Sequence, residues 1–286
     1  MSLKSLLRHL SKKKRKDFYI SDYKGLNFLE EELSKHSIFG LDTEFDWRTT
    51  YHPKLSLIQI SVAKKLFLID CLKVNPQSIL KKFLEDKKIL KIFHSVRSDA
   101  TVLSKCLSIK TKNTFDIQQA EKLLSNNEIK SYGKIVNNFF GINLEKSETN
   151  SNWLKRPLTD LQIRYALDDV DYLLEIYEYQ KKELVKTNQL DQAFFFSKKE
   201  LNLGNESLKK LRLEKNKKKF SIRDREIFLW REDLAEEDDV PPAFIFKDKH
   251  LNYLSKIKAK DKYARKKVMA IIGNTEITNK FISSFL

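Results

Sequence analysis

The chain has 286 residues, enough for two domains, and 41% of them are hydrophobic and 33% charged. This composition argues against a disordered chain, and no apolar run reaches the roughly 18 residues that a membrane-spanning helix needs, so no membrane partner is expected. Lys and Arg outnumber Asp and Glu by 55 to 39, a formal charge of +16. The excess favours a polyanionic partner, because basic side chains that neutralise phosphates release condensed counterions. Charge alone also leaves open a basic protein without such a partner.

Residues 1–16 form a basic arm that contains the charge run Lys12–Lys16. The arm lacks the apolar core and cleavage site of a secretory signal, and a phosphate-seeking arm is favoured over an organellar transit peptide. Cys71 and Cys106 are the only cysteines and lie in apolar stretches, which predicts free thiols and no disulfide framework. We therefore expect a cytoplasmic protein.

Beyond the arm, β-rich runs come first and helical patterns follow. Short polar breaks separate runs that predict strands at 37–45, 55–62 and 66–70, and a further strand follows at 88–93. Helical spacing predicts helices at 76–85, 96–107, 117–125 and 131–140, and a long helix from 159 to 188. This order predicts an α/β sheet domain covered by helices.

The composition shifts after residue 200. Residues 209–219 are strongly basic, and residues 222–286 carry short helical patterns with no convincing strand. The basic run is equally consistent with a solvated linker helix and with a direct nucleic-acid contact. We expect four parts: a basic arm at 1–16, an α/β domain at 17–204, a basic linker at 205–220 and a small all-α domain at 221–286.

Two acids interrupt an apolar strand. Asp42 and Glu44 lie two positions apart in SIFGLDTEF, and such side chains point to the same face of a strand. Two carboxylates that project together repel one another unless a cation is bound. Hard oxygen ligands favour Mg²⁺ or Mn²⁺ over zinc, and the five histidines make no close-spaced ligand pair. A D-x-E pair alone is also common without any function.

Further acids follow the later strand and lie on the long helix. Asp99 falls in the first turn of the helix predicted at 96–107, where the helix dipole alone explains an acid. Tyr165 and Asp169 are four residues apart and therefore share one helical face. Neither feature is unusual by itself, so a function is indicated only by the order of all these residues along the chain.

That order resembles the DEDD superfamily of 3′→5′ exonucleases: D-x-E on a strand, an Asp after a later strand, and Y-x-x-x-D on a late helix. Tyr165 is typical of the Tyr-containing subgroup, because the His-containing subgroup has His five residues before the last Asp, where this chain has Arg164. Three stretches are similar to motifs of the ribonuclease D family: 39–61 (FGLDTEFDWRTTYHPKLSLIQIS), 93–99 (FHSVRSD) and 114–179. The resemblance covers residues 17–190 and implies a ribonuclease H-like mixed sheet with flanking helices.

Residues 222–286 are similar to the helicase-and-RNase-D C-terminal (HRDC) domain. The similarity is carried by residues 227–254: a helix with Trp230, a Val-Pro-Pro turn and a second helix opened by Asp248. The chain has room for one such domain, whereas some ribonuclease D proteins carry two.

The resemblance implies a role for each acid. Asp42 would bridge two divalent ions, Mg²⁺ or Mn²⁺, while Glu44 and Asp169 hold the ion that activates water. Asp99 would support the second ion through water. Tyr165 would orient the attacking water, since a phenol pKa of about 10 makes it a poor base.

Softer assignments concern the substrate and the surrounding structure. Lys146, Arg156 and Gln162 would contact the terminal nucleotides or their phosphates; solvated charges and a helix surface are the alternatives. Trp153 is expected in the core, and Asp116 is expected to cap the helix that follows it.

The family implies an exoribonuclease that trims RNA 3′ ends, of transfer RNA precursors or other stable RNAs, and releases 5′-mononucleotides. A monomer is the default expectation. Two alternatives stay open: a DNA-directed exonuclease of the same superfamily, and a non-catalytic RNA-binding protein that keeps the fold.

Overall fold

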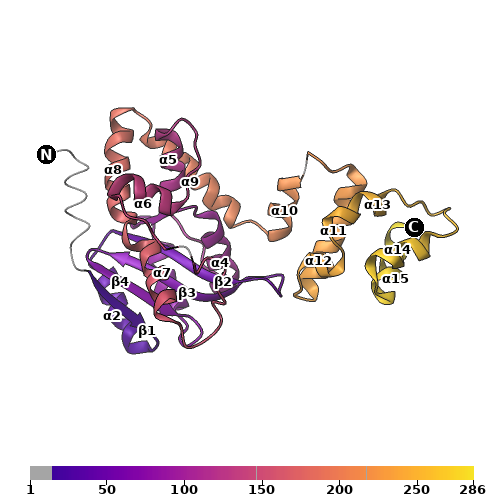
Figure 1. Cartoon of the computed structure of the whole chain (residues 1–286), viewed down its shortest axis with the longest axis horizontal. Coiled ribbons are helices and arrows are strands. Elements are labelled where there is room, and N and C mark those ends of the chain that lie inside the picture. Colours follow the sequence, from indigo (N-terminus) through magenta and orange to yellow (C-terminus); the bar gives the residue numbers. More distant parts are fainter. Residues whose placement is uncertain (1–14, 146, 217) are drawn as a thin grey trace. The chain divides into compact units, whose positions relative to one another are not determined.

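The computed structural model describes residues 15–145, 147–216 and 218–286, and Figure 1 shows its helices and strands. The chain divides into two compact units: the first holds the described residues up to Asp46 together with Lys54–Asn205, and the second holds Trp47–Pro53 and Glu206–Leu286. Most of the basic arm expected at 1–16 lies outside the described residues. No helix in the described part of the chain is both long and apolar enough to cross a membrane.

A six-stranded mixed sheet forms the centre of the first unit, in the order β1-β4-β3-β2-β5-β6. Its strands are β1 (Lys16–Ile20), β2 (Ile38–Asp46), β3 (Lys54–Val62), β4 (Lys65–Asp70), β5 (Leu90–Phe93) and β6 (Thr114–Asp116). β2, β3 and β4 form the antiparallel meander that the sequence predicted, and the other neighbouring pairs are parallel. The sequence prediction missed β1 and β6, which are short strands at the two edges of the sheet. The predicted α/β class is confirmed.

Helices cover both faces of this sheet. They are α2 (Tyr23–Leu33), α3 (Gln77–Leu84), α4 (Arg97–Leu107), α5 (Ile117–Leu124), α6 (Tyr132–Phe140), α7 (Asp160–Asp171), α8 (Leu173–Lys186) and α9 (Leu190–Gly204). α2, α3 and α4 share an apolar core with Leu41 of β2. α5, α6, α7 and α8 build a second core with Leu57 of β3 and Ile92 of β5. Because side chains alternate along a strand, Asp42 and Glu44 point to the α7 face of β2, opposite to Leu41.

The prediction of one long helix from 159 to 188 is wrong, because the segment forms two helices, α7 and α8, that meet at Tyr172. Tyr172 has φ −109° and ψ 1°, which lie outside helical values. Its backbone N–H donates to the hydroxyl of Tyr132 on α6, 3.1 Å away. A hydroxyl group from a distant helix thus accepts a hydrogen bond at the point where α7 ends. The local periodicity of the sequence does not indicate this break.

The second unit is helical, and α11 is its longest helix. Its helices are α10 (Leu208–Asn216), α11 (Ile222–Glu237), α12 (Pro242–Ile245), the 3-10 helix η1 (Asp248–His250), α13 (Leu251–Ser255), α14 (Ala264–Ile272) and α15 (Thr275–Phe285). Ser221 and Asp224 form a capping box at the start of α11. Phe228 of α11 and Phe281 of α15 belong to one apolar core. α10 lies within the stretch expected as a basic linker, and its Leu208 is buried in that core.

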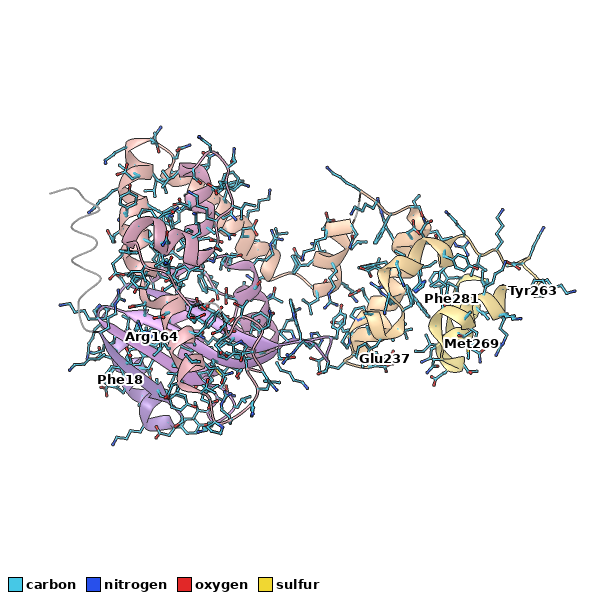
Figure 2. All side chains as sticks on the ribbon, viewed as in Figure 1. Phe18, Arg164, Glu237, Tyr263, Met269 and Phe281 are labelled. Carbon is cyan, nitrogen blue, oxygen red and sulfur yellow. The ribbon has the colours of Figure 1, made fainter. Side chains whose placement is uncertain are left out.

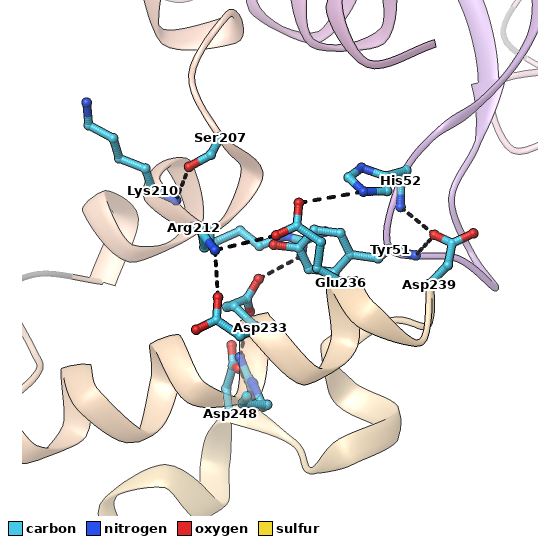
Figure 3. A network of polar contacts seen from close by, with 12 residues as sticks. Tyr51, His52, Ser207, Lys210, Arg212, Asp233, Glu236, Asp239 and Asp248 are labelled. Atoms are coloured by element: carbon cyan, nitrogen blue, oxygen red, sulfur yellow. Dashed lines mark hydrogen bonds and ion pairs between the residues drawn. The ribbon is translucent and has the colours of Figure 1, made fainter.

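The loop between β2 and β3, Trp47–Pro53, belongs to the second unit. Tyr51 is fully buried within the core of this unit, and the guanidinium of Arg212 lies 4.6 Å from the centre of its ring. A carboxylate oxygen of Asp239 accepts the backbone N–H groups of Tyr51 and His52, each at 3.1 Å, and His52 pairs with Glu236 at 3.6 Å (Figure 3). Nothing in the sequence pattern indicated that this loop belongs with the helices of residues 206–286.

Candidate active site

Asp42 and Glu44 sit on β2 where one side of the strand loses its neighbour. β2 pairs with β5 over Ile38–Gly40, and the two acids follow the last of these pairs. On the other side β2 stays paired with β3, where Asp42 faces Gln59 and Glu44 faces Leu57. The strand thus holds both acids on a rigid support and leaves an open side toward the carboxyl end of β5.

Close packing of α8 against the face of β2 that carries the acids depends on Gly40. A Cβ atom at this position would lie 2.4 Å from the hydroxyl of Ser61 and 2.9 Å from Leu173 of α8. The absent side chain therefore lets α8, and α7 just before it, approach the face of β2 that carries the acids.

Three of the four predicted acids converge. Oxygen atoms of Asp42, Glu44 and Asp169 all lie within 4.8 Å of one another. Asp169 reaches this position from α7, which begins with a capping box of Thr159 and Gln162 and buries Ala166 and Val170 among the apolar residues of the sheet. The expectation that these acids lie together is met by the structure.

The fourth acid, Asp99, approaches from the opposite face of β2. It lies in the first turn of α4, is 3% exposed, and accepts a hydrogen bond of 2.6 Å from the hydroxyl of Thr43. Thr43 stands between Asp42 and Glu44 and therefore points the other way. Asp99 is not one of the three converging acids, yet after burial its charge has the largest effect on the pKa of Asp42, which it raises.

All four carboxyl groups are hard to ionise together. Burial, and then the charges of Asp99, Asp169 and Glu44, raise the pKa of Asp42 well above its ordinary value. Burial followed by Asp169 raises the pKa of Glu44 to about 9. The pKa values of Asp99 and Asp169 rise to about 7, chiefly through burial. Repelling carboxylates with oxygen donors this close suit a hard divalent cation, which would relieve the repulsion.

The start of α4, and with it Asp99, is fixed by Asp116 of β6. The Asp116 carboxylate accepts the backbone N–H groups of Ser95 at 2.9 Å, Val96 at 3.0 Å and Gln118 at 2.9 Å. The last bond caps α5, which confirms the expectation from the sequence. The other two hold the turn before α4, where Ser95 adopts a positive φ of 64°. One buried carboxylate thus organises the ends of two helices.

Tyr165 lies one helical turn before Asp169 on α7. Its hydroxyl is 3.3 Å from that of Thr149, and its ring packs near Trp153, with 5.9 Å between ring centres. Burial, then the charges of Asp169 and Glu44, raise its pKa to about 12. The phenol therefore keeps its proton at neutral pH and is able to donate a hydrogen bond. Trp153 is 3% exposed and belongs to the core, as expected.

Of the residues predicted to contact the substrate, those that the structure describes already form hydrogen bonds within the protein. Arg156 holds Asp70 through two bonds of 2.7 Å and donates to the carbonyl of Trp153. Gln162 is 6% exposed and closes the capping box of α7. Lys146 lies outside the described residues. For all three, a contact with RNA stays a prediction.

Two residues near the site were missed at the sequence level. Thr43 holds Asp99, and Asp70 anchors Arg156 and, through it, the segment before α7. Asp70 ends an apolar strand, LFLID, so the signal that singled out Asp42 was present there too. Thr43 gave no signal, because a Thr within a strand is common.

The comparisons with known proteins agree with this geometry. A family model described as a 3′–5′ exonuclease matches residues 18–185, and a model of the HRDC domain matches residues 225–264. Since the first match covers more than half of the chain, this chain belongs to the 3′–5′ exonuclease family. The family implies the use of a divalent metal, and the three converging acids are compatible with it.

Within this family the resemblance to ribonuclease D is confirmed. The chain is 37% identical over 155 residues to ribonuclease D of Desulfotalea psychrophila, covering 54% of this chain and 41% of that protein. It is 32% identical over 251 residues to ribonuclease D of Bartonella henselae, covering 85% of this chain and 61% of that protein. The crystal structure of Escherichia coli RNase D, titled an exoribonuclease involved in structured RNA processing, superposes with a TM-score of 0.80 at 25% identity, over 93% of this chain and 74% of that one. The chain spans about half the length of the curated relatives it matches.

Proposed function

We propose that this protein is a metal-dependent 3′→5′ exoribonuclease that shortens RNA from its 3′ end and releases 5′-mononucleotides. The observation that carries the proposal is the convergence of Asp42, Glu44 and Asp169, with Asp99 beside Asp42 from the other face of the strand. The similarity to proteins named ribonuclease D supports RNA as the substrate.

Each acid has a defined part in this reaction. Asp42, Glu44 and Asp169 would hold one divalent cation, Mg²⁺ or Mn²⁺, and Asp42 and Asp99 would hold a second. When bound, two such cations would lower the pKa of a bound water and stabilise the charge of the departing 3′-oxygen. Tyr165, protonated, donates a hydrogen bond that orients the attacking water. The water oxygen would join the phosphorus and give up a proton to solvent as the bond to the 3′-oxygen of the preceding nucleotide breaks. That 3′-oxygen would take up a proton, which leaves a shortened RNA with a 3′-hydroxyl and a free 5′-mononucleotide.

The finer assignments follow the same proposal. The substrates are 3′ ends of transfer RNA precursors or other stable RNAs, the protein acts in the cytoplasm, and it works as a monomer. Lys146, Arg156 and Gln162 would contact the terminal nucleotides.

A trimming assay tests the proposal. Matched single-stranded RNA and DNA with a 5′ label are incubated with Mg²⁺ or Mn²⁺, or with EDTA. Stepwise shortening of RNA that EDTA and Asp42→Asn both abolish is the expected result. Asp160→Asn, at an exposed acid in the first turn of α7, is the matched control and should retain activity.

Other outcomes decide between the alternatives. Equal shortening of DNA would replace RNA specificity with a general or DNA-directed exonuclease. Salt-sensitive binding of RNA without shortening under any of these conditions would refute catalysis and leave an RNA-binding protein.

A further inference from the structure

A glutamine in the middle of the central sheet has an unpaired amide. Gln59 lies on β3, within the apolar run LSLIQISV, and its side chain is fully buried. Neither Nε2 nor Oε1 of this amide forms a hydrogen bond with any residue that the structure describes. Two other buried glutamines of the same unit, Gln162 and Gln180, each donate through Nε2 to a neighbour. Since a buried amide without a partner destabilises a fold, Gln59 calls for an explanation beyond packing.

The register of the sheet places Gln59 directly opposite Asp42. The two residues form a cross-strand pair between the antiparallel strands β2 and β3. Residues paired in this way point to the same face of a sheet, with Cβ atoms about 4.5–5.5 Å apart. The side chain of Gln59 therefore lies on the face that carries Asp42 and Glu44. α7, which brings Asp169, packs on this face against β3 and β4, and Figure 2 labels Arg164 on that helix.

Two of the positions beside Gln59 on this face hold leucines. Leu57 precedes it by two residues on β3, and Leu68 is its cross-strand partner on β4. Both leucines are buried in the apolar core that α7 shares with the sheet. An apolar residue at position 59 would continue this layer and leave no polar group unpaired. Apolar packing therefore does not explain Gln59, whereas its pairing with Asp42 places the amide beside the acids.

Ser61 follows Gln59 by two residues, and its small size has a packing reason. Its hydroxyl is also buried and has no partner within the described ranges. Ser61 pairs with Gly40, where a Cβ atom would lie only 2.4 Å from the Ser61 hydroxyl. β2 and β3 thus leave room for only a small side chain at position 61. Ser61 has no acid opposite it and therefore serves as a matched control for Gln59.

We propose that Gln59 is a positioning residue of the metal site, whose amide N–H donates to the carboxylate of Asp42 when that carboxylate holds a cation. The bond would fix the rotation of the Asp42 carboxylate, which is the group expected to contact both cations. This inference rests on the proposed function, in which Asp42 is a metal ligand. Hydrogen bonds to metal ligands orient them and strengthen metal binding. Gln59 should accordingly stabilise the fold in the presence of the cation and destabilise it in EDTA.

The test compares the full chain with Gln59→Met, which keeps the length of the side chain and removes the amide. Calorimetry with Mn²⁺ alone should show an affinity about 10- to 100-fold lower in the variant, the range for loss of a hydrogen bond to a metal ligand. In thermal melts with EDTA the variant should be at least as stable as the parent, because an apolar side chain replaces an unpaired amide. In melts with Mn²⁺ the melting temperature of the parent should rise more than that of the variant.

Three further variants separate positioning from structure. Gln59→Leu, a second apolar replacement, should behave like Gln59→Met. Ser61→Ala removes the unpaired hydroxyl opposite Gly40 and should leave Mn²⁺ affinity unchanged. Gln180→Met removes an amide that donates to the carbonyl of Ile117, so it should lower the melting temperature in EDTA and leave Mn²⁺ affinity unchanged.

Two results would overturn the proposal. Parent-like Mn²⁺ affinity in both Gln59 variants would show that the amide does not act on the metal site. A loss of melting temperature in EDTA as large as that of Gln180→Met would show that the amide has a partner without the cation. The proposed function fails separately. If the parent binds Mn²⁺ through Gln59 and shortens no RNA, catalysis alone is refuted; if it shortens RNA and the Gln59 variants bind Mn²⁺ normally, the role of Gln59 alone is refuted.

Discussion

Replacing Arg156 with Met separates two roles for this residue, a contact with RNA and an internal ion pair. In the structure its guanidinium makes a two-pronged contact with Asp70, with 2.7 Å between each pair of atoms, and a further bond of 2.7 Å to the carbonyl of Trp153. The side chain of Asp70 is fully buried and that of Arg156 is 18% exposed. Burial raises the pKa of Asp70, but bonds from Arg156 and Tyr19 outweigh it and hold the pKa below its ordinary value.

Arg156→Met would leave a buried carboxylate without its counter-charge. Asp70 would keep the Tyr19 hydroxyl at 2.5 Å and the N–H of Leu72 at 3.1 Å as donors. Removing one partner of a buried pair costs about 3–5 kcal/mol of unfolding free energy. At roughly 2–4 °C per kcal/mol for a domain of this size, the melting temperature should fall by about 6–20 °C.

Thermal melts and urea titrations of the full chain measure this loss, with Lys155→Met as the control for charge at an exposed neighbour. The double variant with Asp70→Asn should lose less than the sum of the two single losses, because either single change already breaks the pair. A melting temperature within 2 °C of the parent, combined with a raised KM for RNA, would refute this reasoning and favour the substrate contact predicted from the sequence.

Three further predictions concern the site and the packing of α4 against α9. In metal-free protein, the unfolding free energy should fall as pH rises from 4.5 toward 9. Glu44, with a folded pKa of about 9, keeps its proton in this range, whereas the unfolded chain releases it. In melts with EDTA, Glu44→Gln should make the unfolding free energy depend less on pH, and an unchanged dependence would contradict the raised pKa. Tyr165→Phe should lower kcat by less than about 10²-fold, because a protonated phenol orients water and transfers no proton. Its affinity for Mn²⁺, measured by calorimetry, should not change. Complete inactivity would show that Tyr165 does more than orient water. Gly204→Ala should lower the unfolding free energy measured in urea by about 1–3 kcal/mol, because overpacking strains a tight contact. The new Cβ would lie 2.4 Å from the carbonyl oxygen of Arg97. An unfolding free energy equal to that of the parent would show that α4 and α9 can move apart without cost.

The sequence predicted the central part of the site because local rules determine it. Alternation along a strand places Asp42 and Glu44 on one face, and helical spacing places Tyr165 and Asp169 on one side of α7. These motifs lie far apart along the chain, so local rules do not show that they meet in space. The prediction that they converge came from the family resemblance.

The parts that could not be predicted depend on contacts between distant segments. Tyr172 ends α7 with its N–H directed at Tyr132, forty residues away. Asp99 comes from the other face of β2 and is held by Thr43, which resembles any strand residue. Arg156 looked like a phosphate ligand because its partner, Asp70, lies 86 positions earlier.

The membership of Trp47–Pro53 in the second unit has a consequence for how this protein is taken apart. The polypeptide passes from one unit to the other three times, after Asp46, before Lys54 and after Asn205, so a single cut cannot separate them cleanly. Deleting residues 206–286 would remove the side chains that bury Tyr51, and the remaining fragment would expose this aromatic ring in the loop that follows the strand with Asp42 and Glu44. Removing the helices by truncation would therefore require redesign of the β2–β3 loop.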